Sequence, residues 1–252
     1  MKNILLLTFS IFLSQLGIAQ KQFGKVTYKI NSPDAKELAD KSIKREMSEA
    51  SKLYIEQRLR RVVTTLPYVE LELFFSPYEA VLNVDNHMKN ENQLDIKSAL
   101  ARTATNGTYY SNIKEDIFLH ETVSFSVPYL IKTPFNELEW EIHDETKEIL
   151  GYTCIKATTT LEYPFNDFPT TVWFAPELPF PFGPKEFRGL PGLILAMEFN
   201  HFYFYANAID LDIKSMRIKK PSKGREVSQT KYFEELKEHD RAFLKSIGEK
   251  RE

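Results

Sequence analysis

The sequence is poor in the residues that would support several common architectures. Its 252 residues include one cysteine, Cys154, which excludes a scaffold held by internal disulfides. It has nine glycines and no visible repeat, which excludes a collagen-like chain. Its formal net charge of -2 removes the broad attraction that drives nucleic-acid binding, so we expect no nucleic-acid partner. The overall composition, with 42% hydrophobic and 27% charged residues, is typical of a globular protein.

Long hydrophobic runs are also missing, apart from one near the N-terminus. Lys2 precedes an apolar stretch over residues 4–13, and Gly17 and Ala19 place small residues at a cleavage site. This order is that of a secretory signal peptide over residues 1–19. The alternative, a membrane anchor, would need about 20 apolar residues, and this stretch is shorter and interrupted by Ser10. We therefore expect an exported protein in the periplasm or at the periplasmic face of the outer membrane, with no transmembrane span after cleavage.

Residues 20–252 are expected to form a single α+β domain. Residues 23–31 alternate apolar and polar, as in a strand with one solvated face. A long amphipathic helix follows to about residue 64, then many neighbouring strands, and then a helix over residues 230–247. Because the strands are not interleaved with helices, the pattern favours a curved, mostly antiparallel, half-barrel-like sheet. We expect the long N-terminal helix to lie in its concave face.

Two turns are predicted from local composition. The charged residues 144–147 are expected to form a turn ahead of a long strand over residues 148–161. Pro191 followed by Gly192 is typical of a type II turn, in which the glycine takes a positive φ.

A loop rich in proline and aromatic residues lies between residues 163 and 192 and holds seven of the thirteen prolines. Proline fixes φ and removes a backbone donor, so the loop should be stiff without regular structure. We interpret it as a preformed surface for an apolar ligand, a peptide, or a periplasmic or outer-membrane protein partner. The alternative is that its aromatics form a buried lid over one end of the sheet. The candidate binding residues are Phe165, Phe168, Trp173, Phe180, Phe182, Phe187, Gly189, Leu190, Pro191 and Gly192.

The run Gly189–Leu195 (GLPGLIL) has supporting segments upstream of it, in order: the strand around Trp140, residues 146–157, residues 172–177 and residues 181–184. Together they resemble the GLPGLI family of Bacteroidetes secreted proteins, strongly over about residues 139–198. Arg188 stands where that family often carries an aromatic residue. The resemblance implies an exported envelope protein with no established activity.

No catalytic or metal-binding motif stands out. The five histidines include no pair at i,i+2 or i,i+4, and no phosphate-binding loop or nucleophile elbow is present. We expect no metal, no cofactor and no enzymatic activity, and we expect Cys154 to be a small buried apolar residue. Two alternatives remain: a structural envelope component, or a hydrolase in which His143 or His201 meets acidic residues only in three dimensions.

Overall fold

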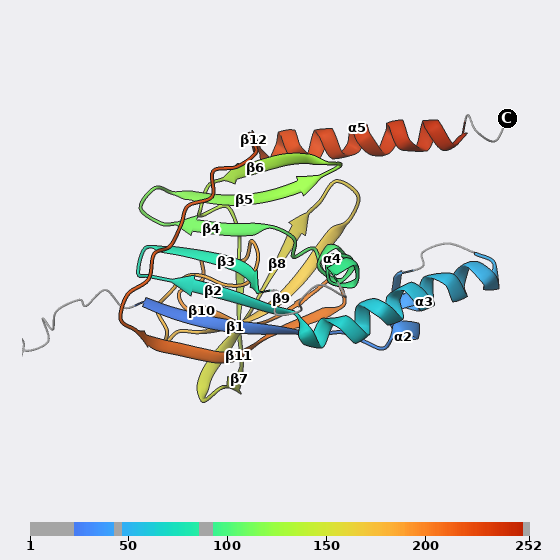
Figure 1. Cartoon of the computed structure of the whole chain (residues 1–252). Coiled ribbons are helices and arrows are strands. Elements are labelled where there is room, and N and C mark those ends of the chain that lie inside the picture. The colour runs from blue at the N-terminus through green and yellow to red at the C-terminus, as the bar shows by residue number, and fades with distance from the viewer. Residues whose placement is uncertain (1–22, 43–46, 86–92, 249–252) are drawn as a thin grey trace, which may run out of the picture.

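The computed structural model describes residues 23–42, 47–85 and 93–248. The predicted signal peptide lies outside these residues. Twelve strands form one sheet in the order β12-β6-β5-β4-β3-β2-β1-β11-β10-β9-β8-β7 (Figure 1). Every neighbouring pair is antiparallel except β12 and β6, which are parallel. The prediction of a mostly antiparallel sheet is therefore confirmed.

The N-terminal strand β1 (Phe23–Asn31) lies at the centre of the sheet and joins two meanders. The first runs outward through β2 (Glu70–Phe75), β3 (Glu79–Asp85), β4 (Thr108–Asn112), β5 (Ile117–Ser124) and β6 (Val127–Thr133). The second runs back inward through β7 (Glu141–Ile149), β8 (Tyr152–Glu162), β9 (Asp167–Ala175), β10 (Leu193–Phe199) and β11 (Phe202–Ile213). The short strand β12 (Arg225–Ser228) then pairs with β6.

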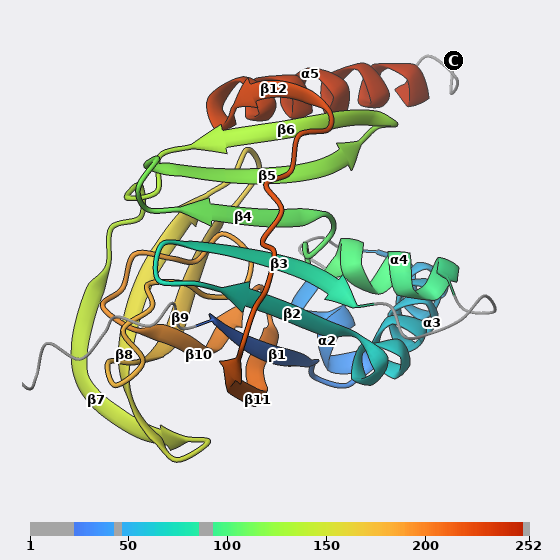
Figure 2. The same ribbon diagram turned by 60° about the vertical axis from the view of Figure 1, so that its left-hand side comes forward.

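The helices have a different layout from the one expected. The N-terminal helical region divides into two helices, α2 (Ala35–Ser42) and α3 (Glu49–Thr65). Asp34 caps the first and Ser48 caps the second. Helix α3 continues into the 3-10 helix η1 (Leu66–Tyr68). Together with α4 (Gln93–Arg102) they gather at one end of the strands (Figure 2). The expectation that a long helix fills the concave face is corrected, because α3 packs mainly on α2, α4 and η1. Helix α5 (Gln229–Gly248) lies along β12 and β6 (Figure 1).

One hairpin turn differs from the sequence prediction. The turn expected at residues 144–147 lies instead at Leu150 and Gly151, whose φ values are 51° and 82°. Two consecutive positive φ values are the geometry of a two-residue turn whose twist matches that of the flanking strands. Phe125 and Ser126 make the same kind of turn between β5 and β6, with φ values of 51° and 65°. Residues 144–147 belong to β7, where their charges protect an edge strand from pairing.

The sheet brings its two meanders close to each other at one end. Residues of β4, β5 and β6 line the same cavity as residues at the end of β8, although seven strands separate β5 from β8 in the sheet order. Buried side chains from both meanders and from the 176–192 loop form the main core. This curvature leaves a concave surface over β7–β11.

Candidate functional site

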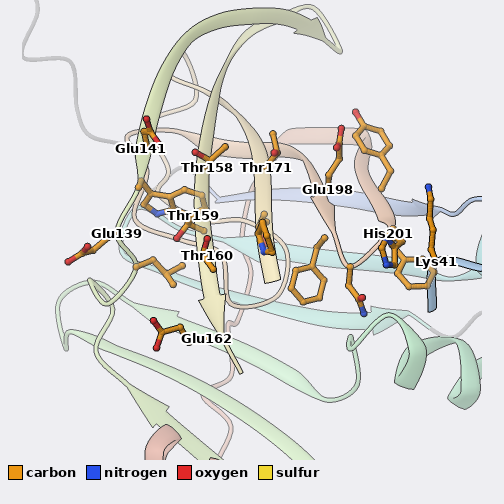
Figure 3. Close-up of a pocket in the computed structure, with 18 of the residues that line it drawn as sticks. Lys41, Glu139, Glu141, Thr158, Thr159, Thr160, Glu162, Thr171, Glu198 and His201 are labelled. Carbon is orange, nitrogen blue, oxygen red and sulfur yellow. The ribbon is translucent and has the colours of Figure 1, made fainter. Parts of the chain in front are cut away.

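An open groove of about 1240 Å³ lies over the strands of the second meander (Figure 3). Its floor is formed by β8, β9 and β10, and the segment leading into β7 forms one wall. Asn31, at the end of β1, and the β10–β11 turn close the opposite side. Leu138 and Trp140 supply apolar surface in a lining that is otherwise rich in hydroxyl and carboxylate groups.

Six of the lining residues form one row across the sheet. The strand pairing places Thr171 opposite both Thr158 and Glu198, and continues the row outward on each side. Neighbouring strands lie roughly 4.8 Å apart, so a row across six strands spans roughly 24 Å. Figure 3 shows its labelled members aligned along one side of the groove. The row is Glu141, Thr158, Thr171, Glu198, Tyr203 and Asn31.

The groove is acidic. One lysine, Lys41, lines it, and that lysine already forms an ion pair with Glu37 at 2.7 Å. An excess of carboxylates repels anionic ligands, so the groove suits neutral or cationic ligands. The glutamates that line it are Glu137, Glu139, Glu141, Glu162 and Glu198.

The threonines of the groove come from two short runs, residues 158–160 on β8 and residues 170–171 on β9. A β-branched residue suits an extended strand, and its hydroxyl both donates and accepts hydrogen bonds. The Thr158 hydroxyl lies 2.8 Å from His143 Nε2, so one hydroxyl of the row has its position fixed from β7. His201 lies in the β10–β11 turn at a φ of 70° and lines the groove.

The predicted binding residues of the proline-aromatic loop lie elsewhere. Phe180, Phe182, Phe187 and Leu190 are at most 5% exposed, and Gly192 is also buried. The expectation that these residues form an exposed apolar surface is corrected, because the side chains of the three phenylalanines and Leu190 fill the core between the sheet and the loop. Phe168 and Trp173 are half-buried, and Phe165, Gly189 and Pro191 are exposed. None of the ten lines the groove.

Ring contacts and backbone hydrogen bonds account for this burial. Phe180 packs on Phe75 with ring centroids 4.6 Å apart, and Phe187 packs 5.6 Å from Phe199. The backbone N–H of Ile194 donates to the Phe182 carbonyl at 3.0 Å. The loop therefore satisfies its backbone groups within the protein and behaves as the lid of the alternative interpretation.

Gly192 serves the loop in a different way from the one predicted. Its φ is not in the left-handed region, whereas Gly189 has a φ of 92°. A Cβ at Gly192 would lie 2.4 Å from the Ala175 carbonyl oxygen, closer than real Cβ contacts. Close approach of two backbone segments, rather than a type II turn, therefore requires this glycine.

Three charged residues of the same loop are largely withdrawn from solvent. The side chains of Lys185 and Arg188 are 0% and 3% exposed, and that of Glu186 is 15% exposed. Lys185 Nζ lies 3.7 Å from Glu186 Oε1, an ion pair rather than a hydrogen bond. The Tyr163 hydroxyl donates to Glu186 Oε1 at 2.6 Å. The Glu186 carboxylate stabilises the charges of Lys185 and Arg188 in a site from which water is largely excluded.

Arg188 connects the loop to the start of the groove wall. Its guanidinium donates to the Glu186 carbonyl and the Pro134 carbonyl, each at 2.6 Å, and to the Thr133 hydroxyl at 3.1 Å. The Arg188 carbonyl accepts a hydrogen bond from Trp140 Nε1 at 2.9 Å. The loop that carries the motif thus positions Trp140 in the groove.

Burial shifts the ionisation of the three charged groups. It lowers the pKa of Lys185 to about 8 and that of Arg188 to about 10. Burial alone would raise the pKa of Glu186, but the charge of Lys185 and the hydrogen bond from Tyr163 lower it overall. At neutral pH the site therefore holds two positive charges and one negative charge.

Other sequence expectations have clear outcomes. Cys154 is a free, fully buried thiol, and burial raises its pKa to about 11, so its apolar role is confirmed. Across the described ranges, no group of three or more His, Cys, Asp or Glu side chains is placed to hold a metal ion. In the same part of the chain, no helix is both long and apolar enough to span a bilayer.

Sequence reasoning missed the groove because its residues come from six strands. Two local signals pointed toward it: the consecutive threonines at residues 158–160 and 170–171, and the alternation of Leu138, Glu139, Trp140 and Glu141. Neither signal reveals that these strands are neighbours.

Comparisons with known proteins found a family model and solved structures that are similar to this chain. A family model described as the N-terminal domain of an N-glycanase peptide matches residues 120–240. A solved structure of PNGF-II in space group P21 is similar with a TM-score of 0.51 and 14% identity, covering 84% of this chain and 32% of that one. A second structure, in space group C2, gives a TM-score of 0.46 at 13% identity, covering 82% and 31%. No curated protein matches. The chain thus resembles in fold a part of PNGF-II about one third of its length.

Proposed function

We propose that this protein is an exported, non-catalytic binding protein of the cell envelope that holds a neutral glycan chain in the acidic groove. The carrying observation is the row of hydroxyl, carboxylate and amide groups across six strands. Carboxylates accept hydrogen bonds from sugar hydroxyls, and threonines both donate and accept them. The half-barrel-like curvature favoured by the sequence supplies the concave floor for such a chain.

Charge and apolar surface favour a sugar chain over the apolar ligand expected at first. An acidic surface disfavours anionic partners, and a wide polar floor disfavours purely apolar ones. Trp140 offers part of its ring in the groove, and an aromatic ring packs well against the C–H face of a pyranose. The match of residues 120–240 to a family model described as an N-glycanase domain supports the same ligand class.

The predicted signal peptide and the resemblance to the GLPGLI family are the reasons for placing the protein in the envelope. In this proposal, the envelope partner expected from the sequence is the molecule that carries the glycan. A lipid or protein that binds through the proline-aromatic loop is not part of the proposal, because the core buries most of that loop.

Isothermal titration calorimetry with N,N′,N″-triacetylchitotriose tests the proposal. We expect saturable binding that Thr171→Trp abolishes, because the indole fills the middle of the row. Thr146→Trp, on the exposed edge strand β7 outside the groove, should bind as the unmodified protein does. Absence of binding, or equal binding by the Thr171→Trp variant, would contradict the proposal.

The salt dependence separates sugar from a basic peptide in the same groove. Binding between a basic peptide and exposed carboxylates weakens steeply with salt, whereas hydrogen bonds to a neutral sugar do not. We therefore expect little change in trisaccharide affinity between low and high salt. Stronger binding of an oligolysine than of the trisaccharide at low salt would favour the peptide.

The contact between His143 and Thr158 gives the hydrolase alternative one specific observation. A histidine next to a hydroxyl is the first pair of a nucleophile and its base. Chromatography of the same trisaccharide after long incubation tests it. Release of shorter sugars, lost in His143→Ala, would show catalysis; we expect the trisaccharide to be recovered intact.

A further inference from the structure

A second, more enclosed cavity of about 510 Å³ lies beside the groove, beneath the first turns of α5. We call it the inner cavity. Strands β4, β5 and β6 form one side, and the end of β8 with the 186–188 segment forms the other. Small-molecule sites fall in the range of roughly 300–1,000 Å³ and combine an apolar body with a few convergent polar groups.

The apolar part of the inner cavity is aromatic. Tyr109, Phe118, Tyr163, Tyr232 and Phe233 contribute to its lining. Flat rings of this kind pack against the faces of a cyclic ligand and restrict its orientation.

The polar part of the inner cavity contains an unused donor. Arg188 lines the cavity, its side chain is 3% exposed, and its Nε finds no hydrogen-bond partner among the described residues. A buried N–H without a partner carries a free-energy cost that an acceptor would remove. A ligand oxygen would supply that acceptor once the Arg188 side chain turns its Nε toward the cavity.

The inner cavity also presents an acceptor. His120 Nε2 lies 2.8 Å from the Asn106 carbonyl oxygen, which can only accept, so Nε2 carries the proton. Burial lowers the pKa of His120, so the ring is neutral at pH 7 and its Nδ1 is an acceptor. Donor and acceptor in one cavity suit a hydroxyl-bearing ligand.

The inner cavity adjoins the acidic groove. Glu137, Leu138, Thr160 and Glu162 line both. A chain lying in the groove and turning past these four residues would place its end in the inner cavity.

We propose that the inner cavity binds the terminal pyranose of the glycan whose following units lie in the groove. This inference rests on the proposed function and adds the subsite that selects the end of the chain. A purely apolar end group would leave Arg188 Nε unpaired, and a strongly anionic one would face Glu137, Glu162 and Glu186.

Contacts between α5 and the sheet hold the roof of the inner cavity in place. The Tyr232 hydroxyl lies 2.6 Å from Ser124 Oγ, and the Tyr129 hydroxyl donates to Glu235 Oε2 at 2.9 Å. Arg225 forms an ion pair with the same glutamate. The helix face that carries Leu236 is therefore positioned to meet the bound sugar.

Calorimetry with N,N′,N″-triacetylchitotriose on two neighbouring α5 variants tests the inference. Leu236→Trp fills the inner cavity and should weaken binding at least about tenfold, a change of roughly 1.4 kcal/mol. Lys237→Trp, at the next and exposed position, is the matched control and should bind within about twofold of the unmodified protein. Gln229→Trp, which also lines the cavity, is the second blocking variant if Leu236→Trp unfolds α5.

The outcomes separate the two proposals. Unchanged affinity in a folded cavity-blocking variant, with binding still lost in Thr171→Trp, would overturn the inner-cavity proposal and leave the groove proposal standing. Loss in the cavity variants with no effect of Thr171→Trp would overturn the groove instead. A protein that binds no trisaccharide at all would overturn both.

Discussion

Replacing Arg188 by methionine tests whether the buried charged loop holds the fold together. Arg188→Met keeps much of the apolar stem but removes three hydrogen bonds, to the Glu186 and Pro134 carbonyls and to the Thr133 hydroxyl. It also removes a guanidinium that lies 4.0 Å from the centre of the Phe118 ring.

The expected loss follows from the groups left behind. A buried polar group without its partner costs about 1–3 kcal/mol, and two of the three acceptors lie on residues that are not exposed. Removing a desolvated charge offsets part of this cost. We expect the free energy of unfolding to fall by about 3 kcal/mol, which lowers the melting temperature by about 10 °C in a domain of this size.

Differential scanning calorimetry and urea unfolding measure the change. Arg217→Met, at an exposed arginine, should leave stability within about 0.5 kcal/mol. Arg188→Lys should give an intermediate loss, because an ammonium cannot reproduce the guanidinium fork. An Arg188→Met protein as stable as the unmodified one would refute the reasoning.

Four further predictions concern the core and the same loop. The pKa of Lys185 is lowered from 10.5 to about 8, so between these pH values the unfolded chain binds more protons than the folded chain. The free energy of unfolding, measured with urea, should therefore rise with pH across that window. The Lys185→Met substitution should flatten this rise. Gly192→Ala should lower the free energy of unfolding by about 2 kcal/mol, because its Cβ would clash with the Ala175 carbonyl. Gly151→Ala should lower it by about 1 kcal/mol, because the new Cβ meets no atom but the residue keeps a φ of 82°. Cys154, buried and with its pKa raised to about 11, should react with a thiol reagent at pH 8 only after urea is added; fast labelling of the folded protein would contradict its burial. Leu190→Asp should lower stability by more than about 3 kcal/mol in a melting experiment, because Leu190 is 1% exposed; a stable variant would restore the loop as a surface.

Local sequence patterns predicted part of the elements of the fold and its mostly antiparallel sheet, but not how the elements meet. The alternation at residues 23–31 matches β1 at both ends, since period-two burial is a short-range property. The hairpin at Leu150 and Gly151 was misplaced, because a charged run is common in turns and also on an edge strand. The positions of α2, α3 and α4 depend on packing between distant elements, which no local pattern specifies.

The candidate site shows the same division more sharply. The proline-aromatic loop stood out because its composition is unusual, yet its aromatics lie in the core. The groove residues are common threonines and glutamates, and only the strand order makes Thr158, Thr171 and Glu198 neighbours. Burial of Arg188 within a loop is likewise a tertiary property, because two of its three hydrogen-bond partners, Thr133 and Pro134, lie more than fifty residues away in the chain.

The fluorescence of Trp140 tests the central claim most directly. In a Trp173→Phe variant, Trp140 is the only tryptophan left, and it lines the groove. Titration with N,N′,N″-triacetylchitotriose should give a saturable change in its emission that persists in about 1 M salt, where the Debye length is about 3 Å. A flat titration, or a change that disappears in salt, would contradict a groove built for a neutral glycan.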